Sequence, residues 1–170
     1  VKLVDGDRAK ELLMTPDDYT AVLSKFDLLS KTNKTGNVTL DDYLKYSSGQ
    51  VVNWTPEEYK TMGEVIESIG RKIKTLGLNI KMPDTIQIIK STMANEGGAD
   101  GYTRGTYIVL KDKNVGNNPG SLNGLVTHEL FHVLSRYDKE MSERVYNTLG
   151  FKKCNEVAYP KEIAELRISN

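Results

Sequence analysis

The clearest pattern of hydrophobic and polar positions in this chain begins at residue 55. Residues 55–58, TPEE, combine a capping Thr, a Pro at the first helical position and acidic residues in the first turn, which together mark a helix start. Apolar residues then recur in alternating steps of three and four, at Tyr59, Met62, Ile66, Ile69, Ile73 and Leu76. This spacing predicts a long helix with one apolar face, which we expect to back a sheet.

Two later segments are rich in the β-branched residues that favour strands. Residues 85–90, TIQIIK, lie between Pro83 and a turn-forming stretch at 95–98, and residues 106–110, TYIVL, form a second run of this kind. We expect the sheet to begin with the first of these segments. Because several helices precede this small sheet and further helices follow it, the pattern predicts an α+β fold.

A second amphipathic helix is predicted after the glycine-containing loop at 114–120. Ser121 is a suitable N-cap, and the helix is expected to end near Arg136. Its apolar stripe consists of Leu122, Val126, Leu130 and Val133. One more helix is expected over residues 139–149, with Gly150 as its stop.

The first third of the chain is predicted to be helical. Residues 15–18, TPDD, repeat the capping pattern of residues 55–58 and predict another helix start. Residues 30–44 resemble a calcium-binding loop, but they offer a single carboxylate where such a loop needs several, so we expect a helix–loop–helix turn without calcium, in which Thr39 caps the next helix. At this length we expect one domain, residues 1–170, in which residues 1–54 form a helical N-terminal extension.

Composition narrows the classes of partner. The 23 Lys and Arg residues balance the 23 Asp and Glu residues, so no positive excess points to nucleic acid or to an anionic membrane. No apolar run approaches the roughly 20 residues that span a bilayer, so no membrane span is expected. The single Cys154 excludes an internal disulfide, and a chain that starts at Val1 suggests processing, which leaves export after removal of a leader open.

The candidate chemistry lies in the second amphipathic helix, where HELFH at residues 128–132 contains both histidines of the chain. Residues four apart on a helix lie about 40° apart around its axis, so His128 and His132 can direct ring nitrogens to one point. Two neutral imidazoles suit Zn²⁺, and Glu129 lies further round the helix, where it can reach a water on the metal as a base. The pattern also occurs by chance, but here it lies in a capped amphipathic helix after a strand and uses every histidine of the chain.

These five residues resemble the active-site motif of the zincin metallopeptidases. The resemblance covers the region from residue 55 onwards loosely and is specific only at the motif. It implies a zincin-like fold with the motif helix behind a small mixed sheet, His128 and His132 as zinc ligands, and Glu129 as catalytic base. It also implies that an edge strand pairs with an extended peptide substrate, a role that would fall to residues 106–110.

A catalytic zinc needs a third protein ligand, and with no histidine left it must be a carboxylate. The metzincin pattern would place Gly at Ser135 and His at Asp138, and the chain has neither. The gluzincin pattern takes a glutamate about twenty or more residues beyond the second histidine, and Glu156 is the first that qualifies. We therefore expect a gluzincin-like site with Glu156 as ligand; Asp138, Glu162 and Glu165 are the alternatives.

The function that follows is hydrolysis of peptide bonds in a peptide or protein substrate. The side chain that supports the oxyanion is left open among Tyr102, Arg104, Arg136, Tyr146 and Tyr159. Two other interpretations stay open: a zincin-like domain that binds a peptide or protein without turnover, and a helical module in which the motif is accidental. Elemental analysis separates the last of these from the others.

Overall fold

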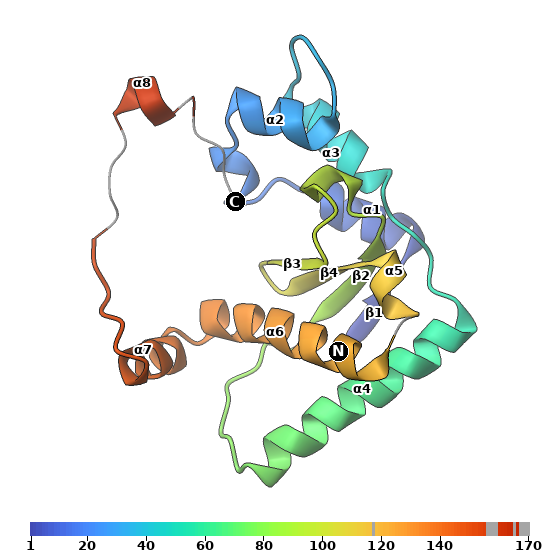
Figure 1. Cartoon of the computed structure of the whole chain (residues 1–170), viewed down its shortest axis with the longest axis vertical. Helices are drawn as coiled ribbons and strands as arrows, with labels where there is room; N and C mark the ends of the chain where they lie inside the picture. Colours follow the sequence, from blue (N-terminus) through green and yellow to red (C-terminus); the bar gives the residue numbers. More distant parts are fainter. Residues whose placement is uncertain (117, 156–159, 165, 167–170) are drawn as a thin grey trace.

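The computed structural model describes residues 1–116, 118–155, 160–164 and 166, with residues 161 and 164 in their backbone only. Figure 1 shows helices on both faces of one small sheet. The strands are β1 (Lys2–Val4), β2 (Gln87–Ser91), β3 (Gly101–Arg104) and β4 (Tyr107–Lys111). The helices are α1 (Gly6–Met14), α2 (Lys25–Thr32), α3 (Leu40–Ser48), α4 (Pro56–Thr75), α5 (Asp112–Val115), α6 (Pro119–Tyr137), α7 (Lys139–Thr148) and α8 (Lys161–Ala164), with short 3₁₀ turns η1 (Thr20–Val22) and η2 (Ala94–Glu96). The predicted α+β class is confirmed.

The sheet is mixed, with the strand order β1-β2-β4-β3. β1, β2 and β4 are parallel, and β3 pairs antiparallel with β4, so that Thr103 lies opposite Ile108. The strand predicted at 106–110 is therefore internal, and the expectation that it forms the substrate-binding edge is wrong. The edge next to β4 is β3, whose four residues contain a single β-branched side chain, Thr103, and gave no strand pattern.

Alternate residues of each strand face two separate hydrophobic cores. On one face, Ile88, Ile108 and Leu110 pack with the apolar stripes of α4 and α6. On the other face, Ile89 and Val109 pack with α1. The period of two residues places successive side chains on opposite faces, so helices cover both sides of the sheet.

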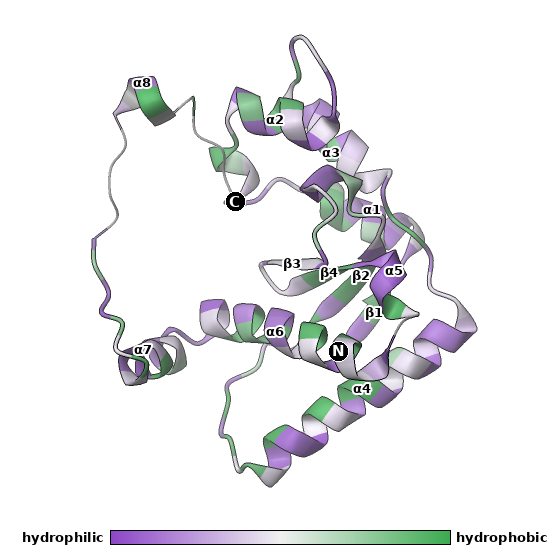
Figure 2. Cartoon of the chain, in the orientation of Figure 1, coloured by the Kyte–Doolittle hydropathy of each residue, from purple (hydrophilic) through white to green (hydrophobic). Residues whose placement is uncertain are grey.

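The long helix predicted after Thr55 is confirmed as α4. The Thr55 side chain accepts a hydrogen bond from the Glu58 N–H at 3.2 Å, and the Glu58 carboxylate accepts one from the Thr55 N–H at 2.8 Å. In Figure 2 the ribbon of α4 alternates between hydrophobic and hydrophilic residues, and its buried positions are Met62, Val65 and Ile69. The capping box therefore fixes where the helix begins, and the apolar stripe fixes which side meets the sheet.

The predicted histidine helix is also confirmed, with a different start. α6 begins at Pro119, and Asn118, not Ser121, is its N-cap and accepts a hydrogen bond from the Gly120 N–H at 2.8 Å. Its predicted stripe is buried and packs against α4 and the sheet. α7 follows directly over Lys139–Thr148, as expected.

The helix start predicted at residues 15–18 is wrong. Thr15 is the C-cap of α1, and the following segment turns because the Asp17 carboxylate accepts a hydrogen bond from the Thr20 N–H while the Thr20 hydroxyl accepts one from the Asp17 N–H, each at 2.8 Å. Asp and Thr side chains that bond the backbone locally compete with helix formation. The predicted helix–loop–helix over residues 30–44 is confirmed, with Thr39 as the cap of α3.

The N-terminal segment contributes to the sheet itself. β1 pairs in parallel with β2, from Lys2 opposite Gln87 to Val4 opposite Ile89, so the sheet does not begin at residue 85. Residues 1–54 are consequently not a purely helical extension. A three-residue strand is too short to show the alternating pattern by which strands are predicted. Within the described part of the chain, no helix combines the length and apolar character needed to cross a bilayer.

Candidate metal centre

The packing of α6 presents its motif residues to a cleft beside the sheet. Leu130 and Val133 anchor the helix in the core, which leaves His128 exposed and His132 half-buried on the side that faces β3. The Nε2 atoms of His128 and His132 lie 3.0 Å apart, with the rings at 84° to each other. Two imidazole nitrogens bound tetrahedrally to zinc at about 2.0–2.1 Å would be about 3.3 Å apart, so the pair fits two positions of a zinc site.

Glu129 lies beside this pair but is turned inwards. It is 4% exposed, and the Thr103 hydroxyl, 2.7 Å from Oε2, donates a hydrogen bond to its carboxylate. Gly101 makes room for the carboxylate, because a Cβ at this position would lie 3.1 Å from Oε1 and 3.3 Å from Cδ. The edge strand thus fixes the position of Glu129 through a hydroxyl on one residue and the lack of a side chain on another.

The backbone of β3 faces the cleft at alternate residues. The Lys111 N–H donates a hydrogen bond to the Asp100 carbonyl at 3.0 Å. With the observed register, the backbone N–H and C=O groups of Tyr102 and Arg104 therefore point towards β4. The N–H and C=O groups of Gly101 and Thr103 therefore point outwards. Arg136, one turn beyond His132 on α6, already donates to the Thr103 carbonyl at 2.7 Å.

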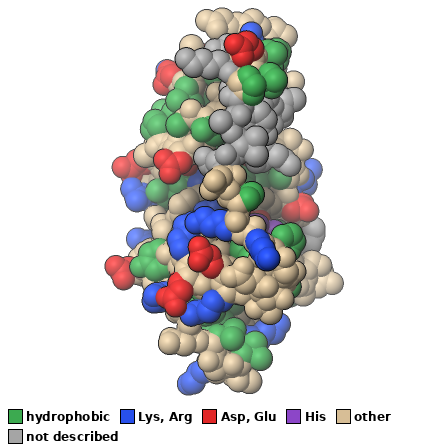
Figure 3. Space-filling model, turned by 90° about the vertical axis from the view of Figure 1, so that its left-hand side faces the viewer, with side chains coloured by type: hydrophobic (Ala, Val, Ile, Leu, Met, Phe, Trp, Pro, Cys, Tyr) green, Lys and Arg blue, Asp and Glu red, His purple; other side chains and the backbone are tan. Residues whose placement is uncertain are grey.

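The space between α6 and β3 is a cavity of about 660 Å³. Its lining residues are Tyr19, Lys31, Glu96, Ala99, Gly101, Tyr102, Thr103, Arg104, His128, Glu129, His132 and Arg136. A small histidine surface is visible in Figure 3, with basic and hydrophobic side chains beside it. The two histidines are thus accessible from solvent, whereas Glu129 is buried.

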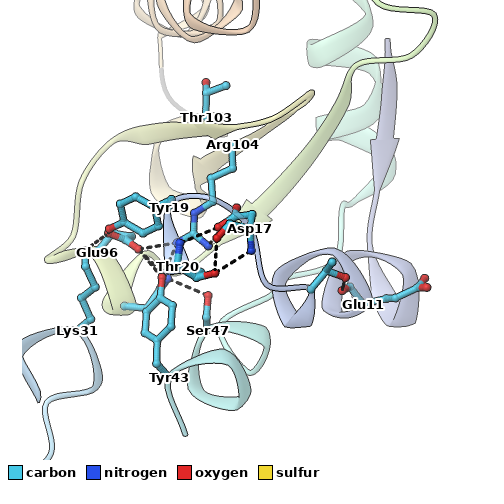
Figure 4. Close-up of polar contacts among 12 residues, drawn as sticks. Glu11, Asp17, Tyr19, Thr20, Lys31, Tyr43, Ser47, Glu96, Thr103 and Arg104 are labelled. Carbon is cyan, nitrogen blue, oxygen red and sulfur yellow. Dashed lines mark hydrogen bonds and ion pairs between the residues drawn. The ribbon is translucent and has the colours of Figure 1, made fainter. Parts of the chain in front are cut away.

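A polar cluster centred on Glu96 forms part of the wall of the same cavity (Figure 4). The Glu96 carboxylate accepts hydrogen bonds from Lys31 at 2.5 Å, from the Tyr43 hydroxyl at 2.8 Å and from Arg104 at 3.2 Å. The Tyr19 hydroxyl donates to it at 3.3 Å, and the Tyr19 ring lies against the Arg104 guanidinium, whose Cζ is 4.3 Å from the ring centroid. One carboxylate therefore joins η2 to α2, α3, β3 and the turn before η1.

The tyrosines of this cluster stay protonated over the physiological pH range. Burial, together with the negative charge of Glu96, raises the pKa of Tyr19 and Tyr43 well above the ordinary value. Burial likewise raises the pKa of Tyr102. As neutral phenols, Tyr19 and Tyr43 act as hydrogen-bond donors to Glu96.

Among the described residues, no candidate for a third zinc ligand lies at the histidine pair. Glu156 and Glu165 lie outside the described residues. Asp138 is the N-cap of α7, where it accepts from the Met141 N–H at 3.0 Å, and Glu162 is exposed on α8. Within the described ranges, no group of three or more His, Cys, Asp or Glu side chains gathers in a metal-binding arrangement, so neither Asp138 nor Glu162 joins the pair.

The candidates for oxyanion support differ in where they lie. Tyr102, Arg104 and Arg136 line the cavity. Tyr146 packs instead between Phe131 and Phe151, with ring centroids 6.3 and 6.1 Å away. Tyr159 lies outside the described residues. Of the three that line the cavity, Arg136 is exposed, whereas Arg104 is only 5% exposed and engaged with Glu96.

Sequence reasoning did not find Gly101, Thr103, Tyr19 or Glu96. None of them belongs to a local motif, and the contacts that place Thr103 beside Glu129 and Tyr19 beside Glu96 join positions 26 and 77 residues apart in the chain. Comparisons of the chain with protein-family models, with curated proteins and with solved structures find no match.

Proposed function

We propose that this protein is a zinc-dependent metallopeptidase of the gluzincin type, with His128 and His132 as zinc ligands, Glu129 as general base and Glu156 as third ligand. The observation that carries the proposal is the arrangement on α6: two imidazole Nε2 atoms 3.0 Å apart beside a buried, hydrogen-bonded carboxylate. The same distance also allows a hydrogen bond between the two rings, so the metal content of the protein decides between a zinc site and a histidine pair without metal.

The chain's own residues supply the proton transfers. A bound zinc would contribute a Lewis acid and a lowered pKa of the attacking water. The Thr103 hydroxyl donates its hydrogen bond to Oε2 of Glu129. The other carboxylate oxygen, Oε1, is then free to accept a proton from the attacking water and to deliver it to the leaving amine. Because Thr103 binds the carboxylate and Gly101 packs closely against it, Glu129 keeps this position without reorganisation during the reaction.

β3 supplies a place for the substrate backbone. An extended peptide that added to this edge would pair with the outward N–H and C=O of Gly101 and with the N–H of Thr103. The Gly101 end of β3 contacts the Glu129 carboxylate, so a peptide bond of the bound substrate would lie next to the base. The substrate class is accordingly a peptide or protein with an extended segment.

Metal analysis tests the proposal most directly. We expect stoichiometric zinc in the purified protein, cleavage of members of a degenerate peptide library, loss of cleavage on chelation and recovery on addition of zinc. Inductively coupled plasma mass spectrometry measures the metal, and mass spectrometry of the library measures cleavage. A protein without stoichiometric zinc contradicts the proposal, and a zinc-loaded protein that binds peptides without cutting any supports the rival function of a binding domain.

Gly101→Ala is expected to lower peptidase activity without loss of zinc. The added Cβ meets the Glu129 carboxylate at 3.1–3.3 Å, so the base must shift, and a misplaced base costs about 10- to 100-fold in kcat/KM. Steady-state kinetics and zinc analysis of the variant provide the measurement.

Gly124→Ala is the matched control, because it makes the same change within α6 at a position where an added Cβ meets no atom within 4 Å. It should keep full activity and raise the free energy of unfolding by about 0.5–1 kcal/mol, the usual gain of Ala over Gly inside a helix. Equal activity in both variants would show that Gly101 does not position the base.

A further inference from the structure

Arg136 is an exposed cation at one end of the cleft. It follows His132 by one helical turn, a rise of about 6 Å along α6. It lines the cavity that contains the histidines and also a second cavity of about 500 Å³ at the Arg104 end of β3. Arg136 therefore lies where the two cavities meet.

The hydrogen bond of Arg136 limits how much of the β3 edge can pair with a substrate peptide. Its Nη1 donates to the Thr103 carbonyl at 2.7 Å, which is the last outward carbonyl of the strand. A peptide paired with Gly101 cannot use that carbonyl and meets the guanidinium in its place. A guanidinium carries five N–H donors and no acceptor, so the group that it can bind here is an acceptor, best of all a carboxylate.

The charges of the second cavity favour the same ligand. Three cations line it, Arg104, Arg136 and Lys139, together with two carboxylates, Asp17 and Asp18. Asp17 is engaged by the Thr20 N–H and lies 4.0 Å from Arg104. In the part of the chain that the structure describes, neither Arg136 nor Lys139 forms an ion pair with an N···O distance of 4.0 Å or less. Two cations without an acidic partner thus face a cavity that continues the substrate cleft.

We infer that Arg136, with Lys139 beside it, forms a subsite that binds a carboxylate of the substrate one or two residues from the cleaved bond. This deepens the proposed function and rests on it. The carboxylate can come from an Asp or Glu side chain or from the C-terminus of the peptide. A peptide antiparallel to β3 would place a residue on the N-terminal side of the cleaved bond here, which allows only a side chain, whereas a parallel peptide would place its C-terminal end here.

Cleavage of matched peptides tests the inference. The best-cleaved library peptide is compared with versions that carry Glu, Gln or Lys at each position near the cleaved bond, each with a free and with an amidated C-terminus. We expect one Glu position, or the free C-terminus, to raise kcat/KM by roughly tenfold over its neutral counterpart, the size expected for a hydrogen bond to a charged group. Arg136→Gln should remove this preference, and Arg136→Lys should keep part of it.

Arg144→Gln is the control, since Arg144 lies on the exposed face of α7 paired with Glu140, away from both cavities. It should keep the preference in full. Equal cleavage of Glu and Gln peptides by the wild-type protein, a preference for Lys, or a preference that survives Arg136→Gln would overturn the inference.

Binding separates this inference from the proposed function. Fluorescence anisotropy with the Glu129→Gln protein reports recognition without turnover. The probes are fluorescently labelled library peptides in matched Glu, Gln and Lys versions, each with a free and with an amidated C-terminus, and they are chosen by binding and not by cleavage. A Glu preference in binding that Arg136→Gln removes supports the subsite even if no peptide is ever cleaved. If no peptide binds, or if all bind alike, the subsite is refuted whatever the activity.

Discussion

Replacing Glu129 with Gln is expected to lower kcat/KM for peptide hydrolysis by about 10²- to 10⁴-fold, the usual contribution of a general base, while the protein keeps its zinc. Gln has the size of Glu, and its amide oxygen can still accept the hydrogen bond from Thr103. The side chain at this position, which is only 4% exposed, therefore keeps a hydrogen-bond partner. It cannot take up the proton of the attacking water. Steady-state kinetics with a library-derived peptide and zinc analysis of the same preparation measure both quantities.

Glu143→Gln is the matched control for this substitution. Glu143 is exposed on α7, 3.6 Å from Lys153, and surface ion pairs of this kind contribute little to stability. Its replacement should change neither activity nor zinc content. If Glu129→Gln retained wild-type activity, Glu129 would not be the base.

Replacing Glu156 with Gln is expected to weaken zinc binding by at least about 100-fold, because outer partners of zinc ligands alone are worth about 10- to 100-fold in affinity. In the proposed site the other two protein ligands are histidines, which bind zinc as neutral imidazoles, so this substitution would remove the one charged ligand. Competition with a chromogenic chelator measures the affinity, and His132→Ala provides the reference for a lost ligand.

Glu162→Gln is the control for Glu156→Gln, because it makes the same substitution at an exposed position of α8. It should bind zinc like the unchanged protein. If Glu162→Gln weakened zinc binding and Glu156→Gln did not, the third ligand would move to Glu162, and a gluzincin-like site closed by Glu156 would be refuted.

Local patterns predicted the elements that carry strong local signals. The capping residues at Thr55 and the spacing from Tyr59 onwards predicted α4, and the β-branched runs predicted β2 and β4, which lie in the middle of the sheet. The two outer strands were missed. β1 has three residues and β3 has four, so neither shows enough alternation, and both are strands because a neighbouring strand supplies their hydrogen-bond partners.

In the candidate site, too, the local features could be predicted from the sequence and the long-range contacts could not. The spacing of His128 and His132 on a helix is local and could be derived from the sequence, and the structure places their nitrogens 3.0 Å apart. The residues that position Glu129 come from β3, which follows from tertiary packing. The cluster around Glu96 joins Tyr19 to Glu96, 77 residues further along the chain, and no pattern within a short window of the sequence can report such a contact.

The cluster around Glu96 makes the first third of the chain inseparable from the motif helix. Tyr19, Lys31 and Tyr43 all bind one carboxylate in the wall of the cavity that also contains the histidines, and β1 forms the outer strand of the sheet next to β2. A shortened protein that started at Thr55 would keep HELFH yet leave Glu96 and Arg104 stripped of most of their neighbours. A minimal fragment that is to keep the surroundings of the motif helix should therefore retain the N-terminal residues.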